Sequence, residues 1–238
     1  MKKMFCMMLT LASLVGFCSC SSDDKEESLN LPTSKSMWVG DVYDLQYKSN
    51  WVSNNTFVAS VSNNGVITAN RAGTANIYSN AHSCQVTVHP NVTLYKEPIT
   101  EWGITQSNLI NKRGKADSSS STAVAYNLNS DITPYEMYSF ENGKLSAAVI
   151  VVSTLYTEYM LEHLSDRYKP AYADSDELTA VFINAETLDQ TSTTITTTYY
   201  NSSYWMVVYM PYNKSSRSTA AKTEIFEFVK SELDKIQF

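Results

Sequence analysis

Few side chains in this 238-residue chain could carry acid–base or metal chemistry. Of its three histidines, His82 and His89 fall at the end of a predicted β-sandwich, where a catalytic centre would be unusual. His163 falls on a predicted helix, three residues before Asp166, and residues three apart share a helix face. The two could form a ligand pair, but we favour a solvated helix face. The sequence contains no H-E-x-x-H, G-x-S-x-G or phosphate-loop motif.

A second acidic group lies in a predicted loop, at Asp174, Asp176 and Glu177. Carboxylates can hold calcium, but this spacing lacks the glycine and the terminal glutamate of a defined calcium loop. We therefore favour a solvated turn. Paired glycosidase carboxylates are spaced in three dimensions and leave no sequence signature. We assign no catalytic residue, metal or cofactor, and we favour a non-enzyme while leaving catalysis open.

The first 19 residues have the organisation of a secretion signal. Lys2 and Lys3 give a short positive region, and Met4 to Phe17 is a continuous stretch of apolar or small residues. This stretch is too short to span a bilayer as a helix, which needs about 20 residues. It is typical of the apolar region of a signal peptide, which is removed from the mature protein.

The signal ends in two cysteines, Cys18 and Cys20, on either side of Ser19. This arrangement resembles a bacterial lipoprotein signal, in which a cysteine after a small residue is lipidated and becomes the mature N-terminus. Cys20 follows the small Ser19 and is the better candidate, because Cys18 follows the bulky Phe17. Phe17 also stands where that motif usually has leucine. A plain secretory signal is the alternative.

Residues 20–29 form a predicted acidic tether between the lipid and the folded chain. Their start, Cys-Ser-Ser-Asp-Asp, resembles the acidic export signal of surface-displayed lipoproteins, which implies an outer-membrane anchor facing the cell exterior. A periplasm-facing anchor is the alternative. Removal of Lys2 and Lys3 changes the formal net charge from −6 to −8, and this acidity argues against a nucleic-acid partner. Cleavage also removes Cys6 and Cys18, and the lipid occupies Cys20. Cys84 is then the one remaining thiol, so no internal disulfide can form.

Residues 30–90 consist of short apolar runs separated by turn residues. Asn64-Gly65 between Val61 and Val66 predicts a hairpin, because both central residues tolerate positive φ. Regularly spaced strands without a helix signal favour a β-sandwich. Five motifs follow in order: Trp51–Asn55, Val58–Val61, Asn64–Ala69, Ala72–Ile77 and Gln85–Val88. Together they resemble the group 2 bacterial immunoglobulin-like domain, which implies that Trp51 and Cys84 are buried and that the domain is a spacer or adhesive module.

Residues 91–238 change to a mixed pattern that predicts an α+β domain of unassigned family. The expected helices are Thr105–Lys112, Thr154–Tyr168 and Thr219–Ile236. The expected strands are Thr122–Leu128, Tyr135–Phe140, Lys144–Val152, Leu178–Ala185, Thr193–Tyr200 and Tyr204–Tyr212. The order favours a duplicated unit of one helix and three antiparallel strands. In pattern alone, it is similar to the repeat of small secreted binding proteins such as the β-lactamase-inhibitor-like group.

Trp205 and Tyr209 are the candidate ligand contacts in this domain. They share one face of the strand Tyr204–Tyr212, while Met206, Val208 and Met210 share the other. If helices cover one face of the sheet, the other face must be solvated or must bind something, and exposed aromatic side chains often mark ligand surfaces. The commoner outcome, in which both faces are buried, stays open and would remove this surface.

These features predict a surface-displayed, lipid-anchored binding protein. The immunoglobulin-like domain would act as a spacer, and the C-terminal domain would recognise a protein, peptide or glycan. A surface hydrolase of unrecognised type is one alternative, and an inhibitor or envelope-assembly accessory protein is another.

Overall fold

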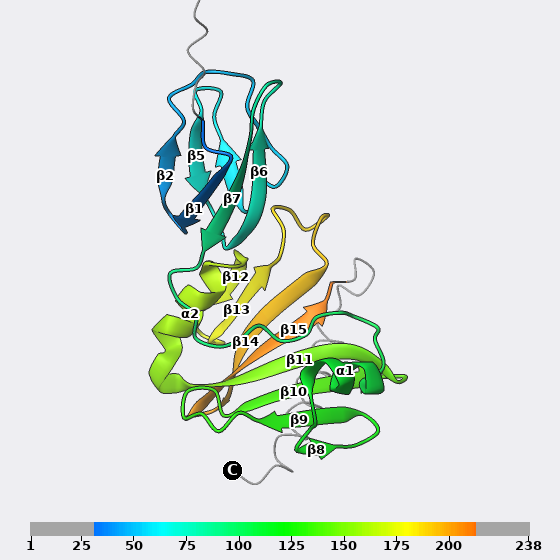
Figure 1. The fold of residues 1–238 in the computed structure, drawn as a ribbon. Coiled ribbons are helices and arrows are strands. Elements are labelled where there is room, and N and C mark those ends of the chain that lie inside the picture. The colour runs from blue at the N-terminus through cyan, green and yellow to red at the C-terminus, as the bar shows by residue number, and fades with distance from the viewer. Residues whose placement is uncertain (1–30, 213–238) are drawn as a thin grey trace, which may run out of the picture. The chain divides into compact units, whose positions relative to one another are not determined.

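The computed structural model describes residues 31–212 (Figure 1). The predicted signal, the Cys20 lipidation site and the acidic tether lie outside these residues, and so does the predicted helix Thr219–Ile236. Neither of the two α-helices within residues 31–212 is long and apolar enough to cross a membrane.

Residues 31–90 form two sheets that enclose one hydrophobic core, as the predicted β-sandwich requires. The first sheet has the order β1-β7-β6-β3, with β1 (Ser34–Trp38), β7 (Ser83–His89), β6 (Gly73–Tyr78) and β3 (Val52–Ser53). The second has the order β2-β5-β4, with β2 (Val42–Asp44), β5 (Val66–Ala69) and β4 (Ala59–Val61). The alternating side chains of these strands point inward on one face of each sheet, and the core they form includes Trp51, Ile67, Ile77 and Val86.

The Asn64-Gly65 turn lies at the position that the sequence predicts. Gly65 has a φ of 85°, and a Cβ atom there would lie 2.5 Å from the carbonyl oxygen of Tyr47. Glycine is required because it alone satisfies both the backbone angle and the close approach. Trp51 is buried next to this turn, and its indole Nε1 donates to the same Tyr47 oxygen at 2.8 Å. Cys84 is also buried, and burial raises the pKa of its thiol.

The rest of the described chain forms one antiparallel sheet of eight strands and two α-helices. The strand order is β12-β13-β14-β15-β11-β10-β9-β8. The first four strands in sequence are β8 (Ser118–Ser119), β9 (Ala123–Asn127), β10 (Tyr135–Glu141) and β11 (Lys144–Ser153). The last four are β12 (Lys169–Asp174), β13 (Thr179–Ile183), β14 (Thr193–Asn201) and β15 (Tyr204–Pro211).

Each group of four strands follows one helix, so the predicted unit of one helix and three strands is one strand short. Helix α1 (Gln106–Arg113) precedes β8, while the short 3₁₀ turn η1 (Thr154–Tyr156) and helix α2 (Thr157–Ser165) precede β12. The missed strands, β8 and β12, are the two outermost strands of the sheet. Edge strands carry polar, exposed residues and therefore lack the alternating apolar pattern that identifies a strand in sequence.

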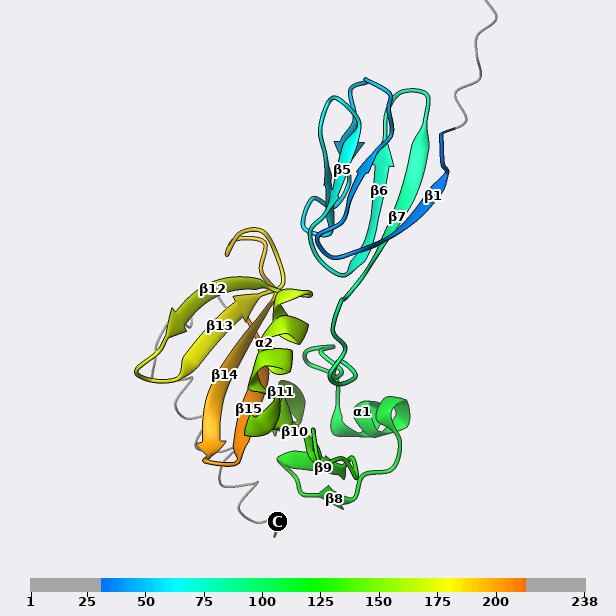
Figure 2. The same ribbon diagram turned by 90° about the vertical axis from the view of Figure 1, so that its left-hand side faces the viewer.

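The helices pack on one face of the large sheet, as Figure 2 shows. Leu109 of α1 and both Met160 and Leu164 of α2 join the core of that face. The opposite face is also apolar and buried, with a separate cluster around Met137, Val149, Val151, Met206 and Val208. The described chain is mostly β-strand. The α+β classification of residues 91–238 stays a prediction, because its expected closing helix lies outside the described residues.

Candidate functional site

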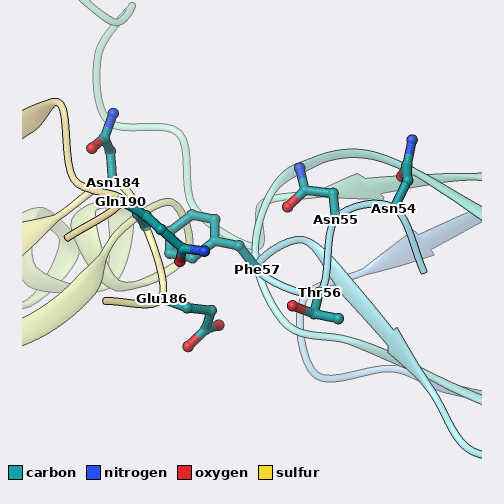
Figure 3. Close-up of a pocket in the computed structure, with 8 residues that line it drawn as sticks. Asn54, Asn55, Thr56, Phe57, Asn184, Glu186 and Gln190 are labelled. Atoms are coloured by element: carbon teal, nitrogen blue, oxygen red, sulfur yellow. The ribbon is translucent and has the colours of Figure 1, made fainter. Parts of the chain in front are cut away.

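A polar groove of about 340 Å³ is the candidate binding site (Figure 3). Two loops line it: the loop that follows β3 and the loop between β13 and β14. The first loop contributes Asn54, Asn55, Thr56 and Phe57, and the second contributes Asn184, Ala185, Glu186 and Gln190. Six of these eight side chains are polar, so the groove offers hydrogen bonds more than apolar contact.

Two of the lining amides, Asn54 and Asn184, form hydrogen bonds within the protein. The Asn184 side-chain oxygen accepts hydrogen bonds from the backbone N–H groups of Ser192 and Thr193, each at 3.0 Å. Its nitrogen donates to the Ser192 hydroxyl at 2.9 Å, which closes the loop. The Asn54 side-chain oxygen accepts from the backbone N–H of Asn76 at 2.8 Å. These bonds fix both walls of the groove before any ligand arrives.

The single charged side chain that lines the groove, Glu186, already has two cationic partners. Lys169 Nζ lies 3.0 Å from its carboxylate, and an Arg71 guanidinium nitrogen lies 3.6 Å away. The Arg71 guanidinium also stacks over the Phe57 ring, 4.7 Å from its centroid. The Nε atom of Arg71 is buried and has no hydrogen-bond partner. The carboxylate in the groove is therefore already paired with cations of the protein.

Other lining groups keep hydrogen-bonding capacity to spare. Within residues 31–212, the Asn55 amide and the Thr56 hydroxyl make no side-chain hydrogen bond, and Gln190 uses only its oxygen, which accepts from Thr187 at 3.3 Å. All three groups are neutral and polar. They can bind a ligand that both donates and accepts hydrogen bonds.

A second polar cluster, which we call the His163 cluster, consists of Glu97, His163 and Tyr168. His163 Nδ1 accepts from the backbone N–H of Leu94 at 3.1 Å, so the ring proton is on Nε2, which donates to Glu97 at 2.8 Å. The Tyr168 hydroxyl donates to the other Glu97 oxygen at 2.6 Å. Both nitrogens of the imidazole are therefore occupied, which leaves neither to bind a metal ion.

Burial and charge set the protonation states of this cluster. Burial lowers the pKa of His163, and Arg167 lowers it further, which together outweigh the opposite effect of Glu97. Burial acts to raise the pKa of Glu97, but the hydrogen bonds from His163 and Tyr168 and the charge of Arg167 bring it below its usual value. A neutral imidazole beside an ionised carboxylate is the favoured state.

The expectation that His163 and Asp166 lie on a solvated helix face is wrong. His163 is fully buried and Asp166 is 4% exposed, because residues 92–97 pack against the C-terminal end of α2. The Asp166 carboxylate accepts from the backbone N–H of Val92 at 2.9 Å, and Arg167 donates to the Val92 carbonyl at 2.9 Å. These hydrogen bonds attach residues 92–97, which have no regular secondary structure, to the end of α2. His163 and Asp166 therefore bind other parts of the protein and are not a ligand pair.

The candidate contact surface at Trp205 and Tyr209 is wrong, and the alternative in which both faces of their strand are buried is correct. They are 6% and 0% exposed, in the core under α2. The Trp205 indole donates to Thr157 at 2.8 Å and stacks on Tyr199, and the Tyr209 hydroxyl lies 2.9 Å from that of Tyr95. Both side chains are interior because β15 pairs with a strand on each side and has buried clusters on both faces.

The acidic loop at Asp174, Asp176 and Glu177 forms a turn stabilised by its own carboxylate. Asp174 accepts from the backbone N–H groups of Asp176 and Glu177 at 2.9 and 3.0 Å. These bonds and the Tyr172 hydroxyl lower the pKa of Asp174. In the part of the chain that the structure describes, no three His, Cys, Asp or Glu side chains are placed to hold a metal ion.

No sequence pattern indicates the groove. Asn55 and Gln190 lie in separate loops on opposite sides of the long segment that carries most of the large sheet, and no sequence motif contains both residues. No protein-family model matches this chain, and a search of curated proteins finds no match. The resemblances to a lipoprotein and to a bacterial immunoglobulin-like domain therefore stay expectations.

Proposed function

We propose that this protein is a lipid-anchored recognition protein on a bacterial surface and that its ligand binds in the groove. Residues 30–90 would be a group 2 bacterial immunoglobulin-like spacer, and residues 91–238 would be the recognition module that shares the groove with it. The observation that carries the proposal is the set of unused neutral side chains at Asn55, Thr56 and Gln190 on walls that internal bonds hold in place. Preorganised polar groups reduce the entropy lost on binding.

The sequence supports the location. An apolar signal of residues 1–19 ends at Cys20, and an acidic tether follows it directly. A lipid on Cys20 would hold the chain at the membrane, because each buried CH₂ group of an acyl chain contributes about 0.8 kcal/mol. An outer-membrane position facing the exterior fits a spacer followed by a binding module.

The anchor is tested by labelling cells with a palmitate analogue. Wild-type protein should carry the label, fractionate with the outer membrane and be accessible to protease on intact cells. Cys20→Ala should lose the label and leave the membrane fraction, whereas Cys18→Ala should keep both. An unlabelled, soluble wild-type protein would contradict the anchor.

The binding site is tested with full-length protein purified in detergent and probed with arrays of glycans and peptides. The double variant Asn55→Ala/Gln190→Ala should lose binding to whichever array gives a signal. Asn111→Ala removes an exposed amide on α1 that does not line the groove, and should bind as wild type does. Equal binding by the double variant and the wild type would refute the groove as the site.

A further inference from the structure

The ligand class follows from the chemistry of the groove. Resting on the function proposed above, we infer that the groove binds an uncharged, hydroxyl-rich ligand, namely a neutral carbohydrate. The inference depends on the charge balance of the lining, on the type of its free hydrogen-bonding groups and on its lack of an apolar anchor. Each of these separates a carbohydrate from another class of ligand.

The charge balance disfavours an ionic ligand. Glu186 is the one charged residue among the eight that line the groove, and Lys169 and Arg71 are both already paired with it. A cationic ligand would have to compete with those two partners. The Glu186 carboxylate would repel an anionic ligand, and the two neighbouring cations, Lys169 and Arg71, are already paired with that carboxylate. Buried or partly buried charges need such partners, so a neutral ligand loses least on entering.

The free groups match hydroxyls. A carboxamide such as Asn55 has two donor hydrogens and an acceptor oxygen, and the Thr56 hydroxyl can act in either direction. A sugar hydroxyl also donates and accepts, so each can pair with a neighbouring amide. In Figure 3 the Asn54, Asn55 and Asn184 side chains extend to the same side of the groove.

The lining disfavours a peptide. Peptides bind most often as an added strand along a sheet edge or as a helix with apolar anchors in a groove. The residues that line this groove come from two loops, and its apolar members are Phe57 and Ala185. The Arg71 guanidinium lies over the Phe57 ring, which leaves less of that ring for an apolar side chain. A volume of about 340 Å³ is at the small end of ligand pockets, and it suits the end of a glycan chain.

The closing experiment compares three arrays, each probed with the full-length protein in detergent. They carry neutral oligosaccharides, oligosaccharides with sulfate or uronate groups, and peptides. We expect binding to neutral oligosaccharides, a loss of affinity of about tenfold or more in Asn55→Ala/Gln190→Ala, and no change in Asn111→Ala. A tenfold loss is the effect of losing about 1.4 kcal/mol, a reasonable sum for two neutral hydrogen bonds.

Salt gives an independent readout, because ion pairs weaken as the Debye length falls from about 10 Å at 0.1 M to about 3 Å at 1 M. Binding of a neutral glycan should change little over this range. A groove-dependent signal on the anionic or peptide array, lost in the double variant, would overturn the carbohydrate class and leave the groove as a binding site. No groove-dependent signal on any array would overturn the class and the proposed function together.

Discussion

The His163 cluster and the groove are both polar and both join segments that lie far apart in the sequence, yet they differ in how completely their hydrogen bonds are used. In the cluster, both imidazole nitrogens and both Glu97 oxygens have partners within the protein. In the groove, the Asn55 amide and the Gln190 nitrogen have none among the described residues. Solvent access differs in the same way. His163 is fully buried, whereas Asn55 is only partly buried and Gln190 is exposed.

This difference separates stabilising polar groups from recognition groups. A buried polar atom must be paired, because leaving it unpaired costs about 1 to 3 kcal/mol. The His163 cluster meets that requirement and stabilises the attachment of residues 92–97 to α2. A solvated polar atom has water as a partner and can exchange it for a ligand at little cost. The residues that look catalytic by type therefore hold the fold together, and the ordinary loop amides remain available for binding.

Removal of His163 should have the largest effect on stability. His163→Ala deletes a fully buried ring, leaves the Leu94 N–H without its acceptor and removes a ring contact with Tyr95 at 4.0 Å. We expect a loss of about 3 kcal/mol in the free energy of unfolding, measured by urea titration. His163→Gln should lose much less, since its carboxamide can still donate to Glu97 and accept from Leu94. Equal losses in the two variants would show that the hydrogen bonds are unimportant.

Acid should destabilise the protein through the same histidine. The pKa of His163 is lowered in the folded state, so its contribution is complete above the unfolded value near pH 6.5 and is lost as the pH falls below it, when only the unfolded chain takes up the proton. The slope for one such proton is at most about 1.4 kcal/mol per pH unit. Urea titrations at several pH values between 7.5 and 5 should show this loss in the wild type and not in His163→Gln.

Glu97 should add to the loss only in more acidic solution. Its folded pKa is lowered, so its contribution is present above the ordinary glutamate range and is lost as the pH falls through the folded value. The two effects therefore occupy different pH windows. A His163→Gln variant that kept the full pH dependence between 7.5 and 5 would place the titrating group elsewhere.

The smallest effect on stability is expected at the groove. Asn55→Ala/Gln190→Ala removes side chains with no donated hydrogen bond inside the described protein, and only the 3.3 Å contact of Gln190 with Thr187 is lost. The free energy of unfolding should change by about 0.5 kcal/mol or less, although the affinity for the ligand should fall about tenfold or more. A large loss of stability would show that these amides are structural, which would make the groove resemble the His163 cluster.

Several local features could be predicted from the sequence because neighbouring residues determine them. Asn142 and Gly143, with φ angles of 50° and 71°, form the turn between the two expected strands Tyr135–Phe140 and Lys144–Val152. Helix α1 begins directly after Thr105, whose hydroxyl accepts from the Asn108 N–H at 3.3 Å, as a capping residue should. Turn and cap preferences act within four residues, so they are visible without the rest of the chain.

The positions of the functional side chains could not be predicted in the same way. The strand that contains Trp205 and Tyr209 alternates correctly, but alternation cannot show whether one or both of its faces are covered. His163 Nδ1 accepts from the N–H of Leu94, which lies 69 residues earlier in the chain. The two groove loops are separated by an even longer stretch of sequence.

The sequence by itself determined the turns, the helix starts and the apolar core of the β-sandwich, because these depend on local backbone preferences and on the alternation of side chains along a strand. The tertiary structure alone decided which polar groups are paired and which are free. That outcome depends on contacts between residues distant in the chain, where a hydrogen bond is formed or left open by packing over distances of a few ångströms.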